Sequence, residues 1–211
     1  MKSLHKPFAL AAALLAALAV AAPAQAQRAR VPAGCKSAEE IRALVTSTGE
    51  ATPAEYKAVL ETFACCSGDE RELEIDRKTC PTFEAYKLLR TDKVKLPPID
   101  SIFEELATHS SPMVRAAAFS DGAHAAHSAF LERDAIAPAA KKAMETETNP
   151  YALRALIGSA SNSGNKMPEA GEFLKKMSEH DNSVLRRRAT AALASPWSDK
   201  VPGVQNPSDL Q

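Results

Sequence analysis

The chain has 211 residues, with 26 basic and 26 acidic side chains and a formal net charge of zero at pH 7. A phosphate backbone is bound by a strongly basic footprint, and the longest local run of cations here is Arg186–Arg188, so the sequence predicts no nucleic-acid partner. Aromatic residues make up only 5% of the chain and Ala is abundant, which favours closely packed helices over a β-sandwich.

Residues 1–26 have the three regions of a secretory signal peptide. Lys2 and Lys6 precede an apolar run from 8 to 22, and Ala24-Gln25-Ala26 forms a small-x-small cleavage site. The run is short for a bilayer span, and no Cys follows it for lipid attachment. We therefore expect an exported protein, periplasmic or secreted, that starts at Gln27 and has no stable membrane insertion after cleavage. A retained membrane anchor is the alternative. Loss of the two leader lysines leaves two more acidic than basic residues.

Four cysteines lie in the first third of the mature chain, at Cys35, Cys65, Cys66 and Cys80. An exported protein meets an oxidising compartment, so two disulfides are expected. A bridge between adjacent cysteines requires a strained ring, which leaves Cys35 paired with one of Cys65 and Cys66, and Cys80 with the other. A redox-active Cys65–Cys66 pair is an alternative. A metal site has less support because the C-x-x-C spacing is missing.

Residues 27–91 are predicted to form an N-terminal helical region. Two capping boxes, Ser37–Glu40 and Thr52–Glu55, start its first two helices. A third helix is expected to carry Phe83, Tyr86 and Leu89, after a charged connection over 69–78. Two prolines in residues 92–98 then indicate a linker and a domain boundary.

Residues 99–195 carry three amphipathic segments, each followed by a turn and an Ala- and Leu-rich helix. A third capping box, Ser101–Glu104, is expected at the first of them. Such a helix pair cannot bury its apolar face alone, so the pattern predicts an all-α solenoid of three stacked pairs. Residues 196–211 are rich in Pro, Ser and Asp, which predicts a mobile tail.

The helix starts His109-Ser-Ser-Pro-Met-Val-Arg115, Thr148-Asn-Pro-Tyr-Ala-Leu-Arg154 and Asp181-Asn-Ser-Val-Leu-Arg186 give the 99–195 region a pattern that resembles HEAT repeats. The resemblance implies polar links between successive pairs, made by the turn residue Asp181 and by Arg115, Arg154 and Arg186. Ser111 and Asn149 stand where that family often has Asp, so the ladder would be incomplete. Purely surface-exposed arginines are the alternative.

Two further groups of residues could carry chemistry. Asp121, His124 and His127 follow one another at intervals of three, which could place metal ligands on one helix face. Packed or solvent-facing histidines are the stronger interpretation, because the H-E-x-x-H arrangement and a distant third ligand are missing. Arg186–Arg188 lie in a first helical turn, where the macrodipole disfavours cations. We expect Asp181 and acids of a neighbouring pair, or an anionic patch on a partner, to offset them.

The sequence has no nucleophile-elbow serine and no Gly-rich loop after a strand, so it predicts no enzyme and no cofactor. The function we expect is a non-catalytic protein-interaction scaffold that binds a protein partner through the concave side of the repeats. Two alternatives stay open. One is a metal- or ligand-handling protein that uses His124 and His127, and the other is a thiol–disulfide partner that uses Cys65 and Cys66.

Overall fold

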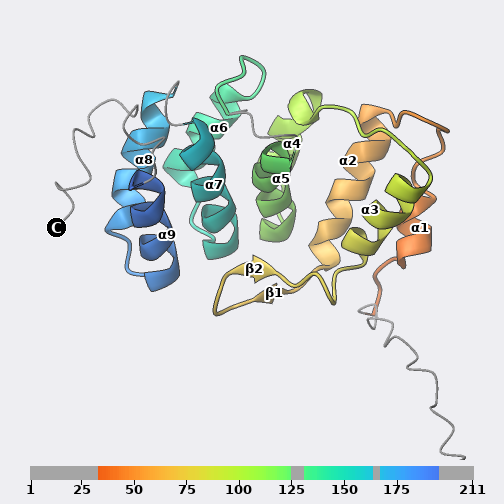
Figure 1. The fold of residues 1–211 in the computed structure, drawn as a ribbon, viewed down its shortest axis with the longest axis horizontal. Helices are drawn as coiled ribbons and strands as arrows, with labels where there is room; N and C mark the ends of the chain where they lie inside the picture. The colour runs from red at the N-terminus through yellow and green to blue at the C-terminus, as the bar shows by residue number, and fades with distance from the viewer. Residues whose placement is uncertain (1–32, 125–130, 164–166, 195–211) are drawn as a thin grey trace, which may run out of the picture.

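The computed structural model describes residues 33–124, 131–163 and 167–194, and these are mostly helical (Figure 1). The elements in chain order are α1 Ala38–Arg42, α2 Pro53–Glu61, the 3-10 turn η1 Thr62–Cys65, β1 Gly68–Asp69, β2 Glu74–Ile75, α3 Pro81–Thr91, the 3-10 turn η2 Ile99–Ser101, α4 Phe103–Ala107, α5 Pro112–His124, α6 Ala137–Thr146, α7 Pro150–Ser163, α8 Pro168–Ser178 and α9 Ser183–Leu193. The predicted helical class is confirmed for this part of the chain. Within it, no helix has the length and apolar character that a membrane crossing requires. The predicted leader and the whole of the predicted tail lie outside the described residues.

The helices beyond residue 99 form two rows. In Figure 1, α5, α7 and α9 stand side by side in front of α4, α6 and α8. The two rows are joined by contacts of α4 with α5, of α7 with α8 and of α8 with α9. The contact between α5 and α7 is the most extensive, because small residues allow the two backbones to approach. The buried alanines of these two helices include Ala116, Ala117, Ala118, Ala152 and Ala155.

One hydrophobic core joins the N-terminal region to these rows. Tyr56, Leu60 and Phe63 of α2 and η1 belong to the same buried cluster as side chains up to Leu193. A smaller cluster, which includes Ile41, Val59 and Leu89, holds α1, α2 and α3 together. The two parts of the chain therefore pack as one unit.

The segment 92–98, expected as a linker, is itself packed. The Lys95 N–H donates to the Gly49 carbonyl at 2.6 Å, and the Ala51 N–H donates to the Lys95 carbonyl at 2.9 Å. Val94 between them is buried, with 9% of its surface exposed. These hydrogen bonds thus connect the segment after α3 to the segment before α2.

Local start signals account for two of the helices. Ser37 and Thr52 each accept from the third helical N–H, and Glu40 and Glu55 reach back, so both predicted capping boxes are present. The predicted box at Ser101 is wrong. Ser101 ends the 3-10 turn η2, and α4 begins two residues later after Ile102, with no side-chain cap. Burial of Ile99 and Ile102 determines where α4 begins, because a helix that began at Ser101 would rotate these two side chains out of their buried positions.

A small antiparallel hairpin replaces the expected charged connection after η1. Gly68 pairs with Ile75 and Asp69 with Glu74. Figure 1 shows the hairpin extending from the side of α2 and α3 beneath the lower ends of α5 and α7. Leu73 in its turn has a left-handed φ of 55°, which costs about 1–2 kcal/mol. Burial of the same side chain, 6% exposed, offsets this cost with about 1.5–3 kcal/mol.

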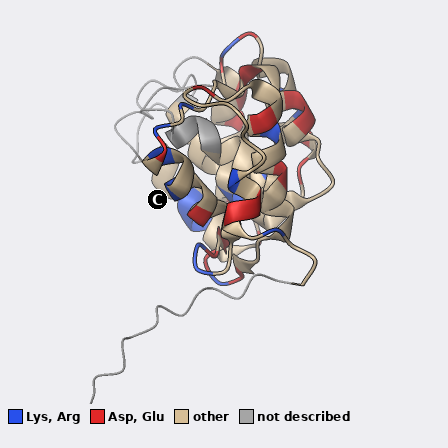
Figure 2. Ribbon diagram, turned by 90° about the vertical axis from the view of Figure 1, so that its right-hand side faces the viewer, with Lys and Arg blue, Asp and Glu red and all other residues tan. Residues whose placement is uncertain are grey.

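Both signs of charge are distributed over several elements, as Figure 2 shows for the end of the molecule seen from the right-hand side of Figure 1. Cations and carboxylates alternate along the ribbons instead of forming separate halves. The ion pairs described below are therefore local contacts, with named partners.

Candidate functional site

The candidate site is the turn edge, which we define as the N-terminal turns of α5, α7 and α9 at residues 109–115, 147–154 and 180–188. All three turns share one hydrogen bond from a backbone N–H to a side chain two residues earlier. His109 Nδ1 accepts from Ser111 at 3.0 Å, and His180 Nδ1 accepts from Asn182 at 2.9 Å. In the middle turn Glu147 Oε1 accepts from Asn149 at 2.8 Å. Each bond satisfies a donor beside a helix start.

Arg115 and Arg186 make matching contacts in the first and last turns. The Nη1 of Arg115 donates to the carbonyls of His109 and Ser110, at 2.7 and 3.1 Å. The Nη1 of Arg186 donates to the carbonyls of His180 and Asp181, at 2.6 and 3.1 Å. Asp181 is exposed and meets Arg186 through its backbone. The expected carboxylate link from Asp181 is therefore replaced by a contact within its own turn, because the arginine folds back on the carbonyls before its helix.

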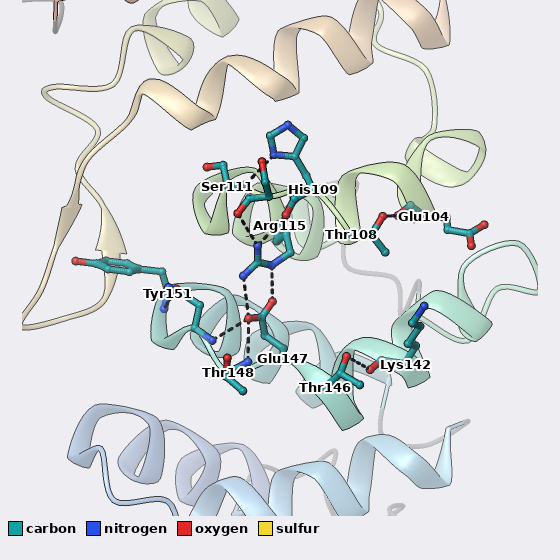
Figure 3. A network of polar contacts seen from close by, with 12 residues as sticks. Glu104, Thr108, His109, Ser111, Arg115, Lys142, Thr146, Glu147, Thr148 and Tyr151 are labelled. Carbon is teal, nitrogen blue, oxygen red and sulfur yellow. Dashed lines mark hydrogen bonds and ion pairs between the residues drawn. The ribbon is translucent and has the colours of Figure 1, made fainter.

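Arg115 also reaches the next pair (Figure 3). Its Nε donates to Glu147 Oε2 at 2.6 Å and its Nη2 to Glu147 Oε1 at 3.0 Å. The side chains are only 18% and 6% exposed. Burial alone would raise the pKa of Glu147, but hydrogen bonds from Arg115 and from the N–H groups of Thr148 and Asn149 outweigh it and hold the pKa below 4.5. This is the polar contact between helix pairs that the sequence led us to expect of Arg115.

A depression of about 250 Å³ opens beside this ion pair, lined by Ala107, Thr108, Arg115, Ala139, Lys142, Ala143, Thr146, Glu147 and Thr148. Two of its threonines use their hydroxyl protons on backbone carbonyls, Thr108 on Glu104 and Thr146 on Lys142, as Figure 3 shows. The carboxylate of Glu147 is saturated by its four donors. The depression thus has a polar wall in which the hydroxyls of Thr108 and Thr146 donate to backbone carbonyls and not to a side-chain base.

Arg154 behaves differently from the other two arginines, because it pairs with Glu74 of the hairpin. Arg188 Nη2 lies 3.1 Å from the same Glu74 oxygen, and Arg187 Nη2 lies 3.1 Å from Glu72 Oε2. Burial and the nearby Arg188 lower the pKa of Arg154. Arg154 therefore contacts the N-terminal region, and it is connected to the next helix pair through Glu74, which also pairs with Arg188 of α9.

The hairpin also supplies acidic partners for the arginines in the first turns of α9. We expected Asp181 or a neighbouring pair to offset them, but the acids that contact Arg187 and Arg188 lie 115 and 114 residues earlier in the chain. Acidic residues recur through the hairpin, at Asp69, Glu70, Glu72 and Glu74. This run is the signal by which the sequence could have revealed an arginine partner.

Glycine allows the hairpin to sit close to α7. A Cβ at Gly68 would lie 2.1 Å from the Tyr151 ring, so any other residue at this position would require the ring to move. Burial and the carboxylates of Glu70 and Asp69 raise the pKa of Tyr151. The first turn of α7 is thus covered by the hairpin.

The α7 stripe, defined as Tyr151, Arg154, Gly158 and Asn162, is the outward side of an otherwise buried helix. Helical spacing places these four positions on one face. Gly158 and Asn162 are exposed, and a Cβ at Gly158 would meet no atom within 4 Å. Beyond the hairpin, the stripe is therefore open to a binding partner.

Two disulfides hold the cysteines, Cys35 with Cys65 and Cys66 with Cys80. This selects one of the two pairings that the sequence left open. The second bridge closes the loop that contains the hairpin, and its sulfur-bearing residues are only 7% and 1% exposed. No cysteine in the described residues has a free thiol.

The metal-ligand candidates are not placed. Asp121 and His124 belong to the last turns of α5 but their side chains are outside the described set, and His127 lies outside the described residues altogether. Elsewhere in the described ranges, no three His, Cys, Asp or Glu side chains gather as metal ligands would.

Comparison with known proteins gives no relative. No known family, curated protein or solved structure matches the chain. The resemblance to HEAT repeats therefore stays a prediction that rests on the turns quoted above.

Proposed function

We propose that this chain is an exported, non-catalytic protein-interaction scaffold, a short HEAT-like stack with a disulfide-tied N-terminal region. Its partner binds along the α7 stripe. The observation that carries the proposal is the stripe itself, an open helix face flanked by α5 and α9 and bounded at one end by the hairpin.

Rigidity of the supporting helices favours a binding role for this face. Several residues of α7 that lie off the stripe are buried, among them Ala152, Leu156, Ile157 and Ala160. In addition, the buried hydroxyl of Ser159 donates to the Phe119 carbonyl and ties α7 to α5. A partner that meets the stripe would lose little conformational entropy in the scaffold, and such preorganisation raises affinity.

Position-specific crosslinking tests the proposal. A photo-crosslinking amino acid is placed at Gly158 or at Asn162, and the control is placed at the exposed Glu172 of α8. In the native cell envelope, both α7 positions should crosslink to one and the same protein, and Glu172 should not. Equal yields from all three positions would contradict a binding site on α7.

A substitution that blocks the α7 stripe tests the same proposal through loss of partner binding. Gly158→Arg adds a bulky side chain where a Cβ meets open space and replaces a glycine inside a helix, so the melting temperature of the protein should stay the same or rise. The crosslink from Asn162 should disappear in this variant. Retention of the crosslink would show that the partner does not cross Gly158. Export is tested separately, by mass spectrometry of the mature N-terminus at Gln27 in the periplasmic or secreted fraction.

A further inference from the structure

Helices α7 and α9 carry positive charge only, whereas α6 and α8 behind them carry both signs. The charged side chains of α7 and α9 are Arg154, Arg186, Arg187 and Arg188. All four lie in the first two turns of their helices, where the macrodipole disfavours cations and favours anions. We define the arginine face as the three of them that contact the hairpin, Arg154, Arg187 and Arg188. Charge and helix direction thus both favour an anionic ligand at this face.

The hairpin covers the arginine face with carboxylates. Residues 69–74 contain four acids and one arginine, and Figure 1 shows the hairpin beneath the lower end of α7. Glu74 contacts both Arg154 and Arg188 through one oxygen. Glu72 contacts the third arginine at 3.1 Å. Since these two acids are separated by one residue, the hairpin shows the kind of ligand that the arginine face accepts, which is a short acidic stretch of polypeptide.

The hairpin satisfies the arginine face incompletely. Glu72 and Glu74 are each 51% exposed, and ion pairs that are this exposed to water are weak. The buried Nε–H groups of Arg154 and Arg188 have no hydrogen-bond partner among the described residues. A guanidinium binds a carboxylate best as a fork, through two of its N–H groups, whereas each contact with the hairpin uses Nη2. The face therefore has hydrogen-bonding capacity that the hairpin carboxylates do not use.

Few contacts hold the hairpin over the arginines. Its ladder has two residue pairs, and the gain from burial of Leu73 is reduced by the left-handed φ of the same residue. At its contact with Tyr151 the hairpin contributes Gly68, which has no side chain to pack. The Cys66–Cys80 bridge closes the loop that contains the hairpin, so a displaced hairpin stays attached to the chain. An acidic segment of a partner can therefore compete with the hairpin for the three guanidinium groups.

We propose that the partner of the α7 stripe carries an acidic segment, which replaces the hairpin carboxylates on Arg154, Arg187 and Arg188. This inference rests on the proposed function, because Arg154 belongs to the stripe, and it names the chemistry of the partner. In the free protein the hairpin occupies the arginine face and covers the first turn of α7. In the complex the acids of the partner bind the guanidinium groups, and the partner continues along the stripe past Gly158.

Fluorescence anisotropy with a labelled peptide tests the proposal on the folded mature protein. The probe is an alternating Glu-Ala peptide, and the same peptide with Gln in place of Glu is the neutral control. The acidic peptide should bind, with an affinity that falls as salt rises, and the neutral peptide should not. Arg187→Gln should weaken binding about fivefold, because the Arg187 side chain is 64% exposed. Glu72→Gln/Glu74→Gln should strengthen binding several-fold, because the competing carboxylates are gone.

Matched variants on the other row of helices separate these effects from a change in net charge. Lys176→Gln removes one cation from α8, and Glu145→Gln/Glu172→Gln removes two acids from α6 and α8, all at exposed positions. Both variants should bind the peptide within about twofold of the unmodified protein, and circular dichroism melting checks that each variant is folded. The proposal is overturned if the hairpin variant binds no better than the variant of α6 and α8, or if Arg187→Gln and Lys176→Gln lose affinity equally. Binding to phosphatidylglycerol vesicles without binding to the peptide also overturns it and assigns the face to a lipid surface.

Crosslinking distinguishes failure of this inference from failure of the proposed function. One protein captured from both Gly158 and Asn162, together with no binding of the acidic peptide, contradicts the acidic chemistry and leaves the α7 stripe as a binding site. Peptide binding that depends on Arg187, together with no common protein captured from the two α7 positions, contradicts the proposed function and leaves the arginine face as a site for acidic segments.

Discussion

Removal of the Glu147 carboxylate should destabilise the protein more than any exposed ion pair can. Glu147→Gln keeps the size of the side chain but takes away the charge that accepts from Arg115 and from two backbone N–H groups. Loss of one partner of a fully buried pair costs about 3–5 kcal/mol. Because the Arg115 side chain is 18% exposed and keeps its two carbonyl contacts, we expect about 2–3 kcal/mol.

Urea denaturation and thermal melting measure this loss. For a chain of this size, about 2–3 kcal/mol corresponds to a fall in melting temperature of about 5–10 °C. The matched control is Arg42→Met, which breaks the exposed pair with Asp92, whose side chains are 38% and 41% exposed. That change should cost less than about 1 kcal/mol. Replacement of both Arg115 and Glu147 by Met should recover much of the loss, because no unpaired buried charge remains.

The same carboxylate gives a pH dependence with a defined sign. The pKa of Glu147 lies below 4.5 in the folded state, so its contribution to stability is complete above pH 4.5 and is lost as the pH falls through the folded-state pKa. Glu147→Gln should therefore lose less stability than the unmodified protein on acidification below pH 4.5. A stability of Glu147→Gln within about 0.5 kcal/mol of the unmodified protein at pH 7 would refute the reasoning.

Three further outcomes are expected. The Glu55 carboxylate accepts hydrogen bonds from Thr46 and from the helix cap, which lowers its pKa to about 2. An NMR titration of Glu55 should find that pKa, and the pKa should rise in Thr46→Ala. A titration midpoint near 4.5 in the unmodified protein would contradict the contact. Gly158→Ala should stabilise the protein by about 0.5–1 kcal/mol in urea denaturation, because the new Cβ meets open space, and a loss of stability would show a hidden clash. The buried Cys66–Cys80 bridge should be reduced later than the other bridge in timed alkylation with mass spectrometry, and the reverse order would speak against its burial.

Contacts between sequence neighbours were accessible to prediction. The capping boxes at Ser37 and Thr52 need only residues three apart, and the helix starts at Pro112, Pro150 and Ser183 follow from turn residues directly before them. The failure at Ser101 has the opposite origin. There the local signal was present, but burial of Ile99 and Ile102 selected another frame.

Contacts between distant residues were not accessible in the same way. The arginines of the repeats predicted that carboxylates lie close to them. They did not identify these carboxylates, because a cation on a helix can pair with any acidic residue that the fold brings close. The choice of Glu74 for Arg154 depends on a hairpin that crosses α7, and that crossing depends on a glycine beneath Tyr151. No regular spacing in the sequence encodes such an encounter.

The sequence by itself determined the helical class, the starts of α5, α7 and α9 and the division of the cysteines into two bridges, because each follows from local spacing or covalent geometry. Only the tertiary structure decided that Cys35 pairs with Cys65, that one core joins the N-terminal helices to the later rows, and that the hairpin carboxylates contact Arg154, Arg187 and Arg188. These features depend on which surfaces meet after the helices form. Burial of apolar surface between the elements decides which surfaces meet, and no regular spacing of residues in the sequence encodes that burial.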